Sequence, residues 1–197
     1  MTQAKPRFTS FDEYLAHADE PEGLFELFNG ELVAVPPESG ENTKVAVFLL
    51  LQFVALVGYR RVRPHGLELE VRGEPKNRFP DLTVLRPGQD AQLQSRNTLR
   101  LSMDPPLLVV EVVSPGEIQR ERDYVAKRSQ YQSRGIPEYW LIDPQQGRVL
   151  VLVLEDETYQ EFGAFRGEEV VRSPQFGNLK LTAQQILGSG SPESNRS

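Results

Sequence analysis

A nearly continuous run of Leu and Val covers residues 107–113 and contains one charged side chain, that of Glu111. The run follows two prolines and stops at the Ser-Pro-Gly sequence 114–116, so its length and flanks predict a strand. A strand that is covered on both faces has continuous apolar residues instead of an alternating pattern. We therefore expect a buried strand here. Its carboxylate needs a partner, because an unpaired buried charge is costly.

The N-terminal part of the chain predicts a β-hairpin preceded by a short helix. Residues 24–35 consist of two apolar segments on either side of Asn29-Gly30, and this dipeptide supplies the positive φ angles of a type I′ turn. Ser10, with an acid three residues later, has the spacing of a capping box and predicts a helix over residues 11–18.

A helix is expected from Asn42, which can cap it, to Gly58. Its portion 45–57 is apolar nearly all round, which is typical of a helix that is buried or packs against a partner subunit. We therefore expect a homodimer. Gln52 interrupts the apolar stretch, which is too short to span a bilayer, so no membrane contact is expected.

The rest of the chain predicts more strands than helices. The expected strands are residues 66–72, 81–85, 138–142 and 148–154, and the expected helices are residues 117–134 and 182–187. A long polar connection is expected over residues 87–106, and a disordered tail over the Ser/Gly-rich residues 188–197. The pattern predicts one domain, residues 1–187, of the α/β (α+β) class, with a β-sheet, flanking helices and an N-terminal β-hairpin.

Charge and composition narrow the possible functions. The 197 residues carry a net charge of −6, and an acidic surface repels phosphates, so broad nonspecific binding of nucleic acid is not expected. The basic clusters at 60–63 and 120–134 are interpreted as solvated faces. The absence of Cys excludes disulfides, thiolate metal sites and a cysteine nucleophile. The first residues form no secretory segment, and we expect a cytoplasmic protein.

Two acids on neighbouring strands are the main candidates for chemistry. Asp81 directly follows Pro80 at the start of a predicted strand, where ligands of open α/β sheets bind. Adjacent strands can bring Asp81 and Glu111 together, and hard cations such as Mg²⁺ prefer carboxylate oxygens. Two structural interpretations stay open: that Asp81 is an ordinary strand entry, and that Glu111 is paired with a buried Arg or Lys.

The helix after Glu111 offers a basic group. At 100° per residue, Arg120, Tyr124, Lys127 and Tyr131 fall within roughly a 60° arc, and the two rings indicate that this face packs inward. Lys127 then lies near the strand ends, where it can orient a water or stabilise charge on a phosphate. The alternative is that Lys127 forms an exposed i,i+4 pair with Asp123.

Other reactive residue types lack partners. His17 and His65 have none at metal-ligand spacing, so we interpret both as surface or loop residues. Ser114 lacks the Gly-x-Ser-x-Gly elbow of a nucleophile and is expected to cap the following helix.

Taken in order, several motifs resemble one known family. They are Pro80-Asp81, the sequence EVVSP at 111–115, the residues Asp123, Lys127 and Tyr131, the sequence GIPEYWLIDP at 135–144, and FELFNGEL at 25–32. Over roughly residues 10–185 the chain resembles the Uma-type family of putative restriction endonucleases, within the PD-(D/E)xK nuclease superfamily. Each motif is weak alone, whereas the ordered set is specific.

The resemblance implies a restriction-endonuclease-like core, a mixed central sheet flanked by helices. It also implies hydrolysis of nucleic-acid phosphodiester bonds, with Mg²⁺ (or Mn²⁺) as cofactor and DNA as the expected partner. By position, Asp81 and Glu111 match the metal ligands. The usual lysine two residues after the second acid is replaced by Val113, and Lys127 stands in its place on the following helix. Glu26 matches an N-terminal acid that adds a metal ligand, or it is only a hairpin residue.

Three hypotheses follow. The first is a metal-dependent endonuclease with Asp81, Glu111 and Lys127 as catalytic residues. The second is a catalytically inactive nuclease fold that acts as a nucleic-acid-binding or scaffold homodimer, which the acidic charge and the displaced lysine favour. The third is a metal-dependent phosphohydrolase that acts on small nucleotides.

Overall fold

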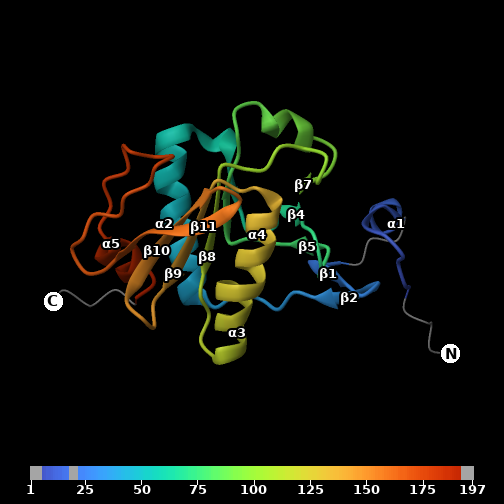
Figure 1. Ribbon diagram of the computed structural model, residues 1–197, viewed down its shortest axis with the longest axis horizontal. Coiled ribbons are helices and arrows are strands. Elements are labelled where there is room, and N and C mark those ends of the chain that lie inside the picture. The colour runs from blue at the N-terminus through green and yellow to red at the C-terminus, as the bar shows by residue number, and fades with distance from the viewer. Residues whose placement is uncertain (1–5, 18–21, 192–197) are drawn as a thin grey trace.

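The protein is described here by a computed structural model of residues 6–17 and 22–191, which form three β-sheets with helices packed against them (Figure 1). The central sheet has six strands in the order β11-β10-β9-β8-β6-β3. In that order the strands are Thr158–Phe165, Arg148–Glu155, Glu138–Asp143, Leu108–Val112, Leu82–Val84 and Val62–Pro64. Strands β8 and β9 are parallel and the other neighbours are antiparallel, so the expected mixed sheet is confirmed.

Two smaller sheets complete the β-structure. Strands β1 (Phe25–Phe28) and β2 (Glu31–Ala34) form the predicted N-terminal hairpin, with φ angles of 49° and 81° at Asn29 and Gly30. The third sheet has the order β5-β4-β7, with bounds Asn77–Arg78, Glu68–Glu70 and Thr98–Leu99. The strand expected at 66–72 is therefore shorter and lies outside the central sheet. The polar connection 87–106 contains β7 and a 3₁₀ helix, η2 (Gln89–Leu93), which are too short to produce a periodic signal.

The α-helices lie close to their predicted positions, whereas the short 3₁₀ helix at Tyr59–Arg61 was not predicted. The helices are α1 (Phe11–Ala16), α2 (Gly40–Val57), the short 3₁₀ helix η1 (Tyr59–Arg61), α3 (Glu117–Glu121), α4 (Arg128–Arg134) and α5 (Ala183–Gly188). Between α3 and α4 lies a π-helical segment, η3 (Arg122–Lys127), so the helix expected over 117–134 is continuous but wider in its middle. Gly135, in the left-handed region at φ 79°, ends it as predicted.

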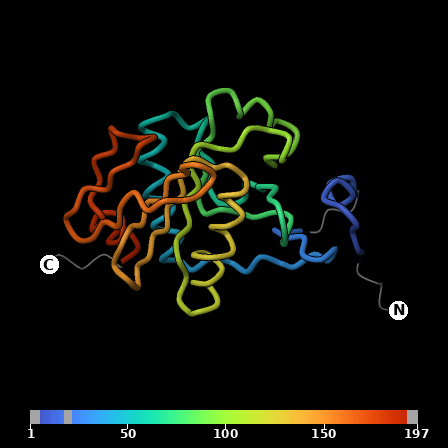
Figure 2. The backbone as a smooth tube through the Cα atoms, viewed as in Figure 1, coloured from blue at the N-terminus to red at the C-terminus, as the bar shows by residue number. Residues whose placement is uncertain are grey.

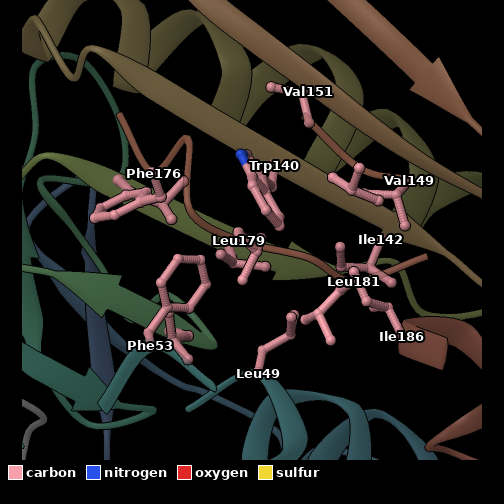
Figure 3. Close-up of a cluster of buried hydrophobic side chains, with 14 of the residues drawn as sticks. Leu49, Phe53, Trp140, Ile142, Val149, Val151, Phe176, Leu179, Leu181 and Ile186 are labelled. Atoms are coloured by element: carbon pink, nitrogen blue, oxygen red, sulfur yellow. The ribbon is translucent and has the colours of Figure 1, made fainter. Parts of the chain in front are cut away.

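Helices cover both faces of the central sheet (Figure 1). On one face, Phe53 of α2 packs edge-on against Trp140 with ring centroids 5.7 Å apart, within a large apolar cluster (Figure 3). On the other face, the α3–α4 helix and the three-stranded sheet cover a second cluster. Val110 points into the first cluster and Val109 into the second, which explains why β8 is apolar at consecutive positions.

Helix α2 is only partly covered by the sheet. Val45, Leu49 and Phe53 are buried, whereas Val47 and Leu51 are 49% and 59% exposed. By length and composition alone α2 is apolar enough to cross a membrane, but core helices of soluble proteins can meet the same criterion. The length and composition of α2 therefore do not show that this helix crosses a membrane.

The two ends of the described chain lie at opposite ends of the long axis, with α1 at one end and α5 at the other (Figure 2). The boundary predicted at residue 187 falls inside α5, which continues through Gly188, and Ser189 and Ser191 make further backbone hydrogen bonds. Residues 192–197 of the expected tail lie outside the described residues, as does residue 18, the predicted end of the first helix.

Candidate active site

The register of two antiparallel strands brings the two candidate acids together. Leu82 of β6 pairs with Val110 of β8, and continuing this register by one residue sets Asp81 opposite Glu111. Asp81 Oδ2 accepts a hydrogen bond of 2.6 Å from the backbone N–H of Val112, the donor that the next residue of a longer β6 would otherwise take. Both acids are buried, with exposed fractions of 5% and 2%.

The pKa values of both carboxylates are raised, and burial is the largest cause. Burial raises the pKa of Asp81 well above its usual value, and the negative charge of Glu111 raises it further. Burial also raises the pKa of Glu111, although the charge of Lys127 opposes that shift. A buried carboxylate with a raised pKa is stabilised either by a proton or by a cation.

The α3–α4 helix supplies partners to Glu111. Lys127 Nζ donates to Glu111 Oε2 at 2.7 Å, and the Tyr131 hydroxyl donates to Oε1 at 2.5 Å. These contacts agree with the inward-facing helix surface predicted from the sequence. They also confirm the alternative that Glu111 is paired with a buried lysine.

Lys127 lies between two acids. Its Nζ is 3.0 Å from Asp123 Oδ1 as well as 2.7 Å from Glu111, and the exposed fractions of Lys127 and Asp123 are 6% and 1%. The i,i+4 pair considered as an alternative therefore exists, but the prediction that it is exposed is wrong. Burial alone would lower the pKa of Lys127, but the charges of Glu111 and Asp123 outweigh it and raise that pKa, so the lysine is charged.

The buried group carries more negative than positive charge. Three buried carboxylates, those of Asp81, Glu111 and Asp123, lie beside two cations. One is the buried Lys127; the other is the partly exposed Arg122, whose Nε donates to Asp123 Oδ1 at 3.1 Å. Asp123 Oδ2 is buried and has no hydrogen-bond partner among the described residues. With all groups ionised, one negative charge is uncompensated, so a further cation would stabilise the group.

The donor set fits a divalent cation of the magnesium type. Asp81 Oδ1 accepts no hydrogen bond from the described part of the chain, while Glu111 keeps unused lone pairs on both oxygens. No cluster of three or more His, Cys, Asp or Glu able to hold a metal occurs among residues 6–17 and 22–191. Two carboxylates are nevertheless enough for Mg²⁺, which typically completes its shell with waters and substrate phosphates.

Glu26 lies elsewhere. Both of its carboxylate oxygens accept hydrogen bonds of 3.1 Å from Arg78, whose Nε is bound by Gln130. The structure therefore does not bring Glu26 together with Asp81 and Glu111. Its assignment as a metal ligand has only the sequence resemblance in its support.

His65, interpreted from the sequence as a surface or loop residue, lies beside the candidate acid Asp81. Pro64 of β3 pairs with Leu82 of β6, and the next position sets His65 beside Asp81, with Nδ1 3.9 Å from Asp81 Oδ1. The two side chains line the same cavity, of about 270 Å³, so Asp81 is reachable from outside the core. The sequence does not predict this position of His65, because the Arg-rich residues 60–63 are typical of a solvated face and not of a strand.

The second basic cluster is also not simply a solvated face. Lys127 and Arg134 are buried, and Arg120 donates to Asp143 at 2.5 Å. Burial would raise the pKa of Asp143, but hydrogen bonds from the Gln146 backbone, Tyr124 and Arg120 hold it below its usual value.

Two capping predictions are wrong. Ser39, and not Asn42, caps α2, since its Oγ accepts from the Asn42 N–H at 3.1 Å. Gly116 precedes α3 without a side-chain cap, and Ser114 instead accepts from Asn42 Nδ2 at 2.9 Å. Asn42 also donates to the carbonyl of Val112 at 3.2 Å, so it joins α2 to the strand end beside the acids.

Comparison with known proteins gives a family and a fold. A model of the Uma2 family, described as "Putative restriction endonuclease", matches residues 11–184. No curated protein matches the chain. Among solved structures, the crystal structure of a putative nuclease belonging to DUF820 from Anabaena variabilis ATCC 29413 has 18% sequence identity and a TM-score of 0.64, over 91% of this chain and 98% of that chain. At this identity the likeness shows a shared fold, and it confirms the expected fold class.

Proposed function

The chain belongs to the Uma2 family, described as putative restriction endonuclease, and on that premise we propose that it is a metal-dependent endonuclease that hydrolyses phosphodiester bonds. DNA is the proposed substrate because the family description names restriction enzymes. The observation that carries the proposal is that Asp81 and Glu111, at the ends of β6 and β8, lie beside Lys127 of η3, in a group that has one uncompensated negative charge when all its members are ionised.

Asp81 and Glu111 are the proposed ligands of Mg²⁺ or Mn²⁺. When bound there, the cation would supply Lewis-acid stabilisation of charge on the phosphoryl oxygens and would lower the pKa of water. Asp81 is held for this role by the Val112 N–H, and Glu111 by Tyr131 and Lys127.

Lys127 is the proposed catalytic lysine. Its ammonium has three N–H donors and two carboxylate neighbours, Glu111 and Asp123, so one donor remains to orient a water or to contact a phosphate oxygen. Because the pKa of Lys127 is raised, the group acts as a positive charge and not as a base.

Cleavage assays with matched variants test this function. Labelled DNA and RNA oligonucleotides are incubated with Mg²⁺, Mn²⁺ or EDTA and with the wild type, Asp81→Asn or Glu111→Gln. We expect metal-dependent cleavage by the wild type only. Glu31→Gln is the control, because it removes the same charge from an exposed acid of the hairpin and should keep full activity. Wild-type cleavage rates in both site variants would contradict the assignment.

A non-catalytic nuclease fold that binds nucleic acid or acts as a scaffold is the second candidate. One observation favours it: both oxygens of Glu111 already have donors in the protein, Lys127 and Tyr131. Mn²⁺ titration followed by electron paramagnetic resonance separates the two functions. The endonuclease requires saturable Mn²⁺ binding that Asp81→Asn removes, whereas the scaffold requires none.

A further inference from the structure

A cavity of about 270 Å³ opens beside the candidate active site, between α2 and the edge of the central sheet. Its lining includes Glu38, Ala46, Val47, Leu50, His65 and Asp81. Asp81 therefore belongs both to the acid group and to the cavity wall. A phosphate held through a cation at Asp81 would bring the attached nucleoside beside this cavity.

The cavity is lined by both apolar and polar residues. Ala46, Val47 and Leu50 of α2 present an apolar wall, and Pro64 of β3 adds to it. Among the polar lining residues, His65 has a buried Nδ1 that has no hydrogen-bond partner in the described part of the chain. Glu38 lines the cavity too, with one carboxylate oxygen bound by Asn42 Nδ2 at 3.3 Å.

We propose that this cavity is a nucleobase subsite, which takes the base next to the phosphate bound at Asp81. A nucleobase has apolar faces, which suit the α2 wall, and a hydrogen-bonding edge, which suits His65 and Glu38. The cavity is slightly smaller than the pockets of drug-sized ligands, so it suits a single heterocycle.

The charge of the protein supports a base contact. With a net charge of −6, the chain gains little affinity from the phosphate backbone as a whole, so a contact with the base would supply part of the binding free energy. The inference rests on the proposed function, because it takes the phosphate of a nucleic acid to lie at Asp81.

A binding experiment tests the subsite without requiring cleavage. Deoxyadenosine monophosphate and deoxyribose 5-phosphate, which lacks the base, are titrated into the full chain with Ca²⁺ and followed by calorimetry. The wild type should bind the nucleotide several-fold more tightly, because the base buries apolar surface against the α2 wall. Ala46→Phe, which fills the cavity, should remove this difference.

Two further variants keep the result interpretable. Leu51→Phe adds the same ring on the exposed side of α2, outside the cavity, and should bind like the wild type. Ala46→Met fills the cavity with a more flexible side chain and replaces Ala46→Phe if that variant fails to fold.

The outcomes separate this proposal from the function on which it rests. Equal affinities of the wild type for the two ligands, or no binding of either, would overturn the subsite, even if the protein cleaves DNA. Loss of a dimer in Ala46→Phe without any nucleotide binding would also overturn it, because the cavity would then be a contact between two copies. A base-dependent affinity that Ala46→Phe removes would support the subsite even if cleavage is absent.

Discussion

Replacing Lys127 by methionine tests the central electrostatic arrangement of the protein. Met has nearly the length of Lys but no charge, so the substitution leaves two buried carboxylates without their shared cation. In the wild type, Lys127 Nζ lies 2.7 Å from Glu111 and 3.0 Å from Asp123, and all three side chains are at most 8% exposed.

The expected loss of stability follows from this burial. Removing one partner of a buried ion pair costs about 3–5 kcal/mol, since the remaining charge has no compensation. This corresponds to a fall of roughly a hundredfold to several thousandfold in the ratio of folded to unfolded protein. For a chain of this size the melting temperature should fall by roughly 6–20 °C.

Urea unfolding of wild type and Lys127→Met, each with EDTA or with Mn²⁺, measures the effect. The substitution raises the uncompensated negative charge of the group from one to two, so Mn²⁺ should stabilise the variant more than the wild type. A loss below about 1 kcal/mol would refute the reasoning, because only a solvent-screened pair is worth so little. A large loss of stability without any effect of Mn²⁺ would support the buried ion pair but would exclude the metal site.

Three other predictions concern different parts of the molecule. Asp143→Asn should lower the free energy of unfolding by about 1–3 kcal/mol at neutral pH. Because the pKa of Asp143 is held low in the folded protein, this loss of stability should shrink as pH falls below about 4. A loss that urea unfolding shows to be independent of pH would contradict this prediction. Gly30→Ala should lower the melting temperature more than Gly147→Ala. Both glycines have positive φ, but only at Gly30 would the new Cβ lie 2.7 Å from a backbone oxygen, that of Phe8. Equal decreases in the two variants would disprove this clash. In sizing experiments at micromolar concentration, the proposed homodimer should appear for the wild type and dissociate in Leu51→Glu, and a monomeric wild type would reject it.

Several features followed from the sequence because local interactions determine them. Asn29-Gly30 specifies its turn through the φ angles that each residue tolerates, and the hairpin has the predicted position. The run around Glu111 predicted a buried strand, since continuous Val and Leu require cover on both faces. The period of the helix that carries Lys127 predicted its inward face despite the π-helical segment.

Other features depended on pairings between distant segments. Strand β3 is only three residues long and carries Arg63, so no local pattern distinguishes it from a surface loop. Its register with β6 is what sets His65 beside Asp81. The burial of Asp123 likewise depends on the sheet beneath the helix, because an i,i+4 pair has the same sequence whether it is covered or exposed.

The sequence by itself thus determined the candidate residues Asp81, Glu111 and Lys127 and the elements on which Glu111 and Lys127 stand. Only the tertiary structure decided that Asp81 shares a cavity with His65 and that Glu26 pairs with Arg78 instead of joining the acids. The physical reason is the range of the interactions: turn dihedrals and apolar periodicity act over a few residues, whereas the counter-ion of a buried charge is selected by strands and helices that meet only in the folded chain.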